Sequence, residues 1–179
     1  MKKKIVLCLM LLVSVFMITG CGSKKESNKE KTKKEDTRKE IVLKDEGYGT
    51  TTFKYAKDKE YEIKEETGGK YKELIISSEK ENFELQIYHT DQVEASYEIA
   101  KNNRSVREGF KEYTWNKLDG YSYNASKTSI SFNILLEDGK VLFGVFDAIN
   151  SDDADMPEAF SGDSIQDLLN SITFKSETN

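Results

Sequence analysis

Residues 22–40 restrict folding to the part of the chain that lies after them. These 19 residues contain no Val, Ile, Leu, Met, Phe, Tyr or Trp, and most are Lys, Glu, Ser, Asn or Thr. Such a segment buries too little apolar surface to offset the conformational entropy that folding removes. We therefore expect residues 41–179 to form one domain and residues 22–40 to be a disordered, charged tether. As a flexible coil the tether would span about 25 Å.

The segment before the tether has the pattern of an export signal. Lys2, Lys3 and Lys4 precede an apolar run from Ile5 to Ile18, which is interrupted only by Ser14. A helix needs about 20 apolar residues to cross a bilayer, and this run is shorter. Its length and its basic start are typical of a secretory signal peptide. We expect residues 1–20 to be that peptide.

The end of the apolar run resembles the bacterial lipobox. Ile18, Thr19 and Gly20 stand before Cys21, in the order aliphatic residue, small residue, glycine and cysteine. The resemblance implies that signal peptidase II recognises Ile18, Thr19 and Gly20 and cleaves before Cys21. It also implies that the Cys21 thiol carries a diacylglyceryl group. The alternative is an ordinary signal peptide, or an uncleaved anchor, in which Cys21 is incidental.

The cysteine count favours lipidation. The chain has two Cys, and Cys8 lies inside the signal peptide. Cleavage would leave Cys21 without a disulfide partner in an exported protein, and lipidation explains such a lone thiol. Two fatty acyl chains, such as palmitoyl chains, anchor a protein stably where one chain is marginal. We expect export to the outer face of the cell membrane. The high lysine content of the sequence suggests a Gram-positive host.

The tether and the domain differ in net charge. Residues 41–179 contain 16 Lys or Arg and 27 Asp or Glu, a net charge of -11, within a total of -5 for the chain. An acidic domain repels phosphate backbones, so we expect no nucleic-acid partner. The tether contains eight Lys or Arg and five Asp or Glu. Contact of its lysines with anionic lipid therefore stays open beside its role as a spacer.

The domain has three hairpin signals. Gly68-Gly69 separates 61–67 from 70–77, and the implied register sets Ile63 opposite Leu74 and Glu65 opposite Lys72. Asp119-Gly120 is expected to join strands at 113–118 and 121–126. Asp138-Gly139 is expected to join 128–137 to 140–149. The implied register sets Leu136 opposite Val141, Ile134 opposite Phe143 and Phe132 opposite Val145, all on one face. Apolar residues on both faces place this third hairpin at the centre of the sheet.

Other patterns predict one further half-buried strand and two helices. Phe83, Leu85 and Ile87 alternate with polar residues. Asp91 resembles an N-cap, with Glu94 three residues later, and the helix that follows is expected to run toward Glu112. Asp163 is expected to cap a second helix, with a buried stripe formed by Ile165, Leu168, Leu169 and Ile172. A final edge strand is predicted at 172–174, after an acidic loop at 151–161.

These elements predict an α+β domain. We expect an antiparallel, twisted sheet of about six or seven strands with two helices packed on one face. The element order and the closing sequence Ile165–Phe174 resemble the PsbP/Mog1-like fold, over roughly residues 48–175. Members of that group are mostly non-enzymatic accessory or binding proteins, and the resemblance implies the same role here.

The search for catalytic and metal-binding residues gives few candidates. The single His, His89, is interpreted as a strand-end residue with a local hydrogen bond, and no Gly-x-Ser-x-Gly elbow is present. Asp152, Asp153, Asp155 and Glu158 suggest a calcium site, but their spacing does not match an EF-hand, and a solvated acidic loop is favoured. Lys101, Arg104, Arg107 and Lys111 would share one side of the mid-chain helix, favoured as a solvated face over a site for an anionic partner. We expect no metal or cofactor.

Tyrosine supplies the candidate binding residues. All nine tyrosines lie in the domain, and several must fall on the outer sheet face. Exposed Tyr is common in contacts with proteins and glycans, although Tyr also favours strands for structural reasons. Tyr88, Tyr121 and Tyr123 are our candidates.

The sequence thus predicts a membrane-anchored surface lipoprotein with a non-catalytic binding or accessory domain. Its partners would be membrane lipid, through acylated Cys21, and an envelope or extracellular protein or glycan. The alternative is an extracellular enzyme that acts on wall or envelope substrates through carboxylates. A solute-binding protein ranks last, because 139 residues are few for a two-lobed receptor.

Overall fold

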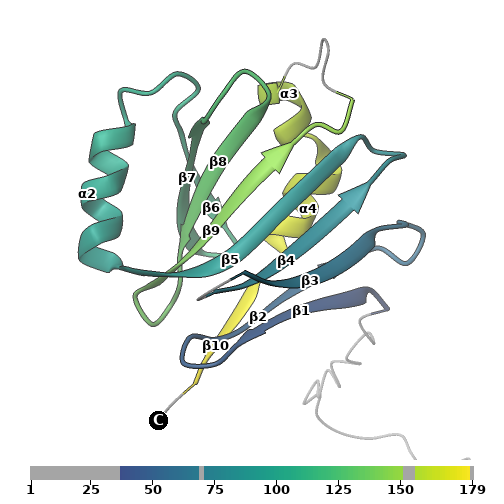
Figure 1. The fold of residues 1–179 in the computed structure, drawn as a ribbon, viewed down its shortest axis with the longest axis horizontal. Coiled ribbons are helices and arrows are strands. Elements are labelled where there is room, and N and C mark those ends of the chain that lie inside the picture. Colours follow the sequence, from purple (N-terminus) through teal and green to yellow (C-terminus); the bar gives the residue numbers. More distant parts are fainter. Residues whose placement is uncertain (1–36, 69–70, 151–155, 178–179) are drawn as a thin grey trace, which may run out of the picture. The chain divides into compact units, whose positions relative to one another are not determined.

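The computed structural model describes residues 37–68, 71–150 and 156–177, all within one compact unit, Asp36–Asn179. Its larger sheet has seven antiparallel strands (Figure 1). In spatial order they are β3 (Glu62–Gly68), β4 (Tyr71–Ser78), β5 (Phe83–Val93), β9 (Lys140–Asp147), β8 (Ser129–Leu135), β7 (Leu118–Asn124) and β6 (Lys111–Trp115).

A smaller antiparallel sheet is built from the two ends of the domain. Its strands are β1 (Lys39–Asp45), β2 (Gly49–Tyr55) and β10 (Thr173–Ser176), with β2 in the middle. Three helices complete the described part of the chain: α2 (Glu94–Arg104), α3 (Met156–Phe160) and α4 (Asp163–Asn170).

The main core lies on one side of the larger sheet, which we call its inner face. Alternate residues of β4, β5, β8 and β9, such as Leu74, Leu85, Phe132 and Leu142, are fully buried there. They form one cluster with the buried residues of the smaller sheet, α3 and α4. Both helices lie behind the larger sheet in Figure 1. Because strand side chains alternate between faces, the remaining residues of these strands define an outer face.

Helix α2 packs on the outer face. Its one fully buried residue, Tyr97, belongs to a second cluster with Tyr121, Tyr123 and Val141. The α+β class and the antiparallel, twisted sheet are therefore confirmed, and the larger sheet has the expected number of strands. The prediction that both helices pack on one face is wrong, and the separate smaller sheet was not expected.

The Gly68-Gly69 hairpin is present, but its register differs from the prediction by two residues. Pairing continues to Gly68 and Tyr71, which sets Ile63 opposite Ile76 and Glu65 opposite Leu74. A shift of two leaves every side chain on its predicted face. The Glu65 carboxylate still forms an ion pair with Lys72, at 2.5 Å, diagonally across the two strands.

The prediction of a turn at Asp119-Gly120 is wrong. Both residues lie inside β7, and the turn is formed by Asn116 and Lys117, which have φ of 47° and 72°. Two successive positive φ angles are the signature of a type I′ hairpin turn, and Asn tolerates this conformation well. Trp115 and Leu118 therefore close the hairpin as a pair.

The Asp138-Gly139 hairpin is central, as predicted, because β9 and β8 lie fourth and fifth among the seven strands. Its register is wrong by one residue: Leu135 pairs with Val141, and Phe132 with Gly144. Three residues separate Leu136 from Lys140, and Gly139 has a φ of 78°. A shift of one residue moves Phe143 from the predicted inner face to the outer face.

The mid-chain helix begins later and ends earlier than expected. Asp91 does not cap it, because β5 continues to Val93, and the helix runs from Glu94 to Arg104. The Asp91 carboxylate instead accepts hydrogen bonds from the Tyr48 and Tyr71 hydroxyls. A register shift between Thr90 and Val93 then leads the chain from the sheet into the helix.

The C-terminal predictions are mostly confirmed. Ile165, Leu168, Leu169 and Ile172 are buried, and β10 is an edge strand, although of the smaller sheet. Gly162 rather than Asp163 is the N-cap of α4. Residues 156–160 of the expected acidic loop form α3, with Met156 and Phe160 buried. Residues 151–155 lie outside the described residues.

Candidate functional site

The outer face brings the three candidate tyrosines together in two neighbouring rows. One row crosses the sheet from Tyr88 through Phe143 and Asn133 to Tyr121, and Tyr123 pairs with Ser131 in the next. Tyr121 and Tyr123 are only 1% and 8% exposed, because α2 covers them. Tyr88 is half-buried. Of the three candidates, it is therefore the one that a partner can reach.

Helix α2 is held on this face by aromatic and charged contacts. The rings of Tyr97 and Tyr121 are 5.3 Å apart between centroids, and the Arg104 guanidinium lies 5.1 Å from the centroid of Tyr123. Lys101 forms an ion pair with Glu112 at 3.3 Å. The cations predicted to line a solvent-facing side of this helix therefore point toward the domain.

The other two cations of that predicted set lie beyond the helix, which ends at Arg104. Arg107 is exposed in the following turn. The Lys111 ammonium lies 5.0 Å from the Tyr113 ring centroid in β6. The predicted cationic helix face, as a single surface, does not exist.

An aromatic row crosses the part of the outer face that α2 leaves open. The centroids of Tyr71 and Tyr88 are 5.5 Å apart, and those of Tyr88 and Phe143 are 5.1 Å apart. All three rings are half-buried. Burial, together with the charge of nearby Glu73, raises the pKa of Tyr88, so its hydroxyl stays protonated and can donate a hydrogen bond. We call Tyr71, Tyr88 and Phe143 the aromatic row.

His89 lies on the inner face, between the two sheets, and is completely buried. Its Nε2 is 2.9 Å from the hydroxyl of Thr51, which lies on β2 and is equally buried. Its Nδ1 faces Asp45 Oδ2 at 3.8 Å, and neither atom has a hydrogen-bond partner among the described residues. The predicted hydrogen bond of His89 exists, but it joins two sheets and is not local.

The surroundings of His89 keep its imidazole neutral. Burial, and then the positive charge of Lys140, lower its pKa to about 4. The Tyr48 ring stacks on the imidazole at 5.8 Å, and Phe174 meets it edge-on at 6.0 Å. Burial also raises the pKa of Asp45.

Hydroxyl, imidazole and carboxylate are the groups of a hydrolase triad. However, Thr51 and His89 have no exposed surface at which a substrate could meet them. The cluster of Thr51, His89 and Asp45 is therefore a polar part of the core that joins the two sheets.

A surface pocket of about 360 Å³ has two carboxylates in its lining. It lies between the start of α4 and the start of β5, and Glu81 and Asp163 both line it. Glu81 forms an ion pair with Lys59 and accepts a hydrogen bond from the Tyr61 hydroxyl at 3.4 Å. Burial alone would raise the pKa of Glu81, but its hydrogen bonds, chiefly from Lys59, lower it. A carboxylate stabilised in its charged form is a poor general acid.

The calcium suggestion gains no support from the described residues. Glu158 is exposed on α3, while Asp152, Asp153 and Asp155 lie outside the described residues. In the part of the chain that the structure describes, no three His, Cys, Asp or Glu side chains come together as a metal site.

Sequence reasoning missed two features of the outer face. Phe143 was assigned to the core because the three-residue loop before β9 was not recognised, although Gly139 was the signal for it. Asn133 was not predicted to lie on the outer face, where it stands between Phe143 and Tyr121 and is 4% exposed. A polar residue within a run of apolar ones was the available signal.

The candidate lipidation residues Ile18, Thr19, Gly20 and Cys21 lie outside the described residues, as does the tether up to residue 36. Within the described ranges, none of the helices has the length and apolar character needed to cross a bilayer. Comparison with protein-family models, curated proteins and solved structures gives no significant match for this chain.

Proposed function

We propose that the protein is a lipoprotein anchored to the outer face of the cell membrane through Cys21, and that its domain binds a partner without catalysis. The sequence Ile18-Thr19-Gly20-Cys21, directly after a basic start and a short apolar run, carries this proposal. The thioether and acyl chains on Cys21 would hold the protein in the membrane. The charged tether would hold the domain about 25 Å from it.

The arrangement of polar groups in the domain supports a binding role over catalysis. The one hydroxyl–imidazole–carboxylate cluster of the described residues is buried, and Glu81 is neutralised by Lys59. By contrast, the aromatic row is half-exposed on a sheet face that α2 covers only in part. Aromatic side chains on a rigid sheet offer a large contact area at little cost in conformational entropy.

We also propose that the domain is related in fold to the PsbP/Mog1-like group. The order of a strand meander, a mid-chain helix, further strands and a closing helix and strand supports this likeness. The buried stripe of Ile165, Leu168 and Leu169 in the closing helix supports it as well. The accessory or binding role common in that group is compatible with the outer face described above.

Site-specific crosslinking on intact Gram-positive cells tests this function. The photoreactive residue p-benzoylphenylalanine replaces Tyr88 in one variant and Glu98, on the exposed side of α2, in a control. We expect a defined crosslinked product from position 88 and none of the same size from position 98. Protease added to intact cells should remove the domain. A domain that resists protease in intact cells but not in lysed ones would contradict surface display, and equal products from both positions would contradict this binding face.

A further inference from the structure

We propose that the outer face binds an extended, arginine- or lysine-rich segment of a partner protein, with its cationic side chains lying across the aromatic row. This inference rests on the proposed binding function and adds the chemistry of the partner. Two independent features of the outer face carry it: its charge and its aromatic row.

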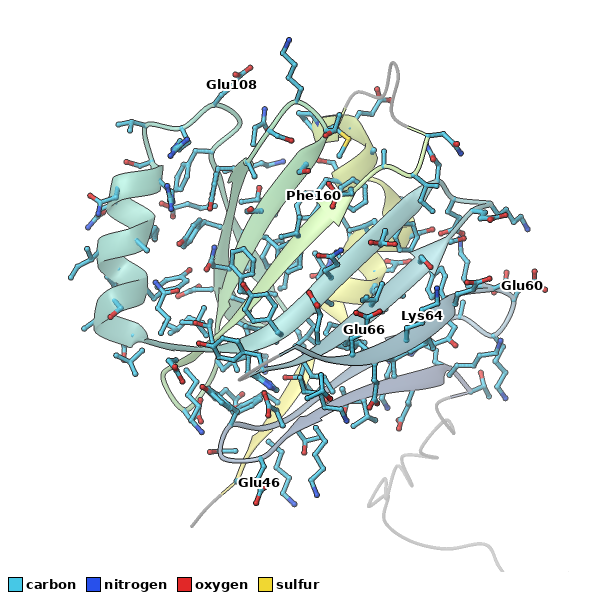
Figure 2. The ribbon with its side chains drawn as sticks, in the orientation of Figure 1. Glu46, Glu60, Lys64, Glu66, Glu108 and Phe160 are labelled. Carbon is cyan, nitrogen blue, oxygen red and sulfur yellow. The ribbon has the colours of Figure 1, made fainter. Side chains whose placement is uncertain are left out.

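The outer face is strongly acidic. On the part of it that β3, β4, β5 and β9 form, the strand registers place five carboxylates and one lysine, Lys64. The carboxylates are Glu62, Glu66, Glu73, Glu84 and Asp147. None of them forms an ion pair with a described residue. Figure 2 labels Lys64 and Glu66 on β3, at the edge of this face. Such a face attracts cations and repels anionic ligands such as nucleic acid or anionic lipid.

The acidic groups border an apolar floor. Glu73 lies between Glu66 on β3 and Tyr88 on β5, and Phe143 follows Tyr88 in the same row. In the next row, Ile75 and Val145 flank Gln86. Arginine and lysine have long apolar stems and a charged end, so their stems can cover this floor while their heads reach the carboxylates. A guanidinium or ammonium group over Tyr88 or Phe143 would also gain cation–π attraction.

Asn133 lies between the aromatic row and Tyr121, which α2 covers. The residue is 4% exposed, and its side chain forms no hydrogen bond with a described residue. Its neighbours Phe132 and Ile134 point into the core, which directs Asn133 to the outer face.

Asn133 has as little exposed surface as Tyr121 and Tyr123, so a partner meets the aromatic row and the carboxylates and not this amide. A glycan would also use the aromatic row, but it has no need of five uncompensated carboxylates. The charge therefore favours a cationic peptide.

Binding of a fluorescent deca-arginine peptide to the full-length lipidated protein, in a neutral detergent, tests this inference. Deca-citrulline, which has the same shape without the charge, is the matched probe. The face variant carries Glu84→Gln and Asp147→Asn. The control variant carries Glu46→Gln and Glu60→Gln, which remove the same charge at the periphery of the domain (Figure 2). A third variant, Tyr88→Ala, removes the centre of the aromatic row.

We expect deca-arginine to bind the wild type and the control variant within about twofold of each other, and the face variant about tenfold more weakly. Tyr88→Ala should weaken binding by at least about fivefold, with an unchanged circular dichroism spectrum. Deca-citrulline should bind far more weakly than deca-arginine.

Equal weakening in the face and control variants would show general attraction to an acidic domain and would overturn the inference. Equal affinity for both peptides would overturn it as well. Fatty-acid labelling at Cys21 is unaffected by these substitutions, so failure here leaves the lipoprotein proposal standing.

Discussion

The indole ring of Trp115 lies against the backbone of Gly120 on the neighbouring strand: a Cβ atom added to Gly120 would be 2.4 Å from Cζ3 of that ring. Trp115 is 1% exposed, and its Nε1 donates a hydrogen bond to Gln166 on α4 at 3.0 Å. The glycine of the Asp119-Gly120 pair therefore serves packing rather than a turn. The hairpin turn lies at Asn116 and Lys117 instead, where φ is positive.

Gly120→Ala should lower the free energy of unfolding by about 1–3 kcal/mol, because the buried indole cannot move without disturbing α4. Urea unfolding measures the change. Ser122→Ala is the control on the same face of β7, and it should cost less than about 1 kcal/mol because the Ser122 hydroxyl forms no hydrogen bond to a described residue. If Gly120→Ala has no measurable effect, the packing of Trp115 against this strand is wrong.

Lys117→Gly should stabilise the protein by about 0.5–1 kcal/mol. Lys117 has a φ of 72°, a conformation that glycine adopts without strain and that other residues rarely adopt. Asn116 stays in place, since its side-chain amide donates a hydrogen bond to the Ile172 carbonyl at 2.5 Å. Lys117→Ala retains the strained backbone and should be nearly neutral. A loss of stability in Lys117→Gly would contradict the turn described here.

Phe132→Ala should cost about 3–5 kcal/mol, and Phe143→Ala less than about 2 kcal/mol. Phe132 is completely buried, and its ring fills the space above Gly144, where an added Cβ would lie 2.0 Å from Cζ. Phe143 is half-buried on the outer face. Both substitutions remove the same atoms from central strands, so the difference reports the face on which each ring lies. The reverse order would show that the register of β8 and β9 is wrong.

How much of this could be predicted depended on the range of the interactions involved. The alternation in β5 and the apolar stripe of α4 follow from local periodicity, and both were predicted correctly. The hairpins at Gly68-Gly69 and Asp138-Gly139 were also recognised, but the turn predicted at Asp119-Gly120 lies at Asn116 and Lys117. The registers of all three depend on loop length and on side chains that are distant in sequence. Trp115 excludes a side chain at Gly120, and Gly139 closes a three-residue loop.

The candidate sites show the same limit. Tyr88 was placed correctly on the outer face, because an unbroken alternation determines the direction of its side chain. Tyr121 and Tyr123 are covered because α2 packs on them. No local sequence pattern predicts where a helix packs against a sheet. The partner of His89 is Thr51, 38 residues earlier and in the other sheet. Such a contact exists only once the sheets have packed together.

Stability should fall as the pH decreases from about 6.5 to 4, in part because of His89. Its folded pKa, about 4, lies below the usual value of 6.5, so the unfolded chain takes up this proton first. The contribution is complete above pH 6.5 and amounts to about 3 kcal/mol, which is lost as the pH falls to 4. The positive charge of Lys140 disfavours protonation of His89, while the carboxylates of Asp138 and of the facing Asp45 favour it.

Urea unfolding of the wild type and of His89→Gln at several pH values separates this contribution from the others. Asp45, whose pKa is raised, acts in the opposite direction as the pH falls, and it is present in both proteins. The wild type should lose more stability than His89→Gln over this range, by about 3 kcal/mol. Parallel curves would show that the imidazole of His89 is not buried in its neutral form.

Metabolic labelling with an alkyne fatty acid tests the membrane anchor most directly. Cys21 provides the one thiol of the proposed lipobox, and no neighbouring hydroxyl can form the thioether in its place. Wild type should label and partition into detergent, and Cys8→Ala, which removes the signal-peptide thiol, should behave in the same way. Cys21→Ala should lose the label and keep the uncleaved run Ile5–Ile18. If Cys21→Ala labels as strongly as the wild type, the protein is not anchored through Cys21 and the lipoprotein proposal is wrong.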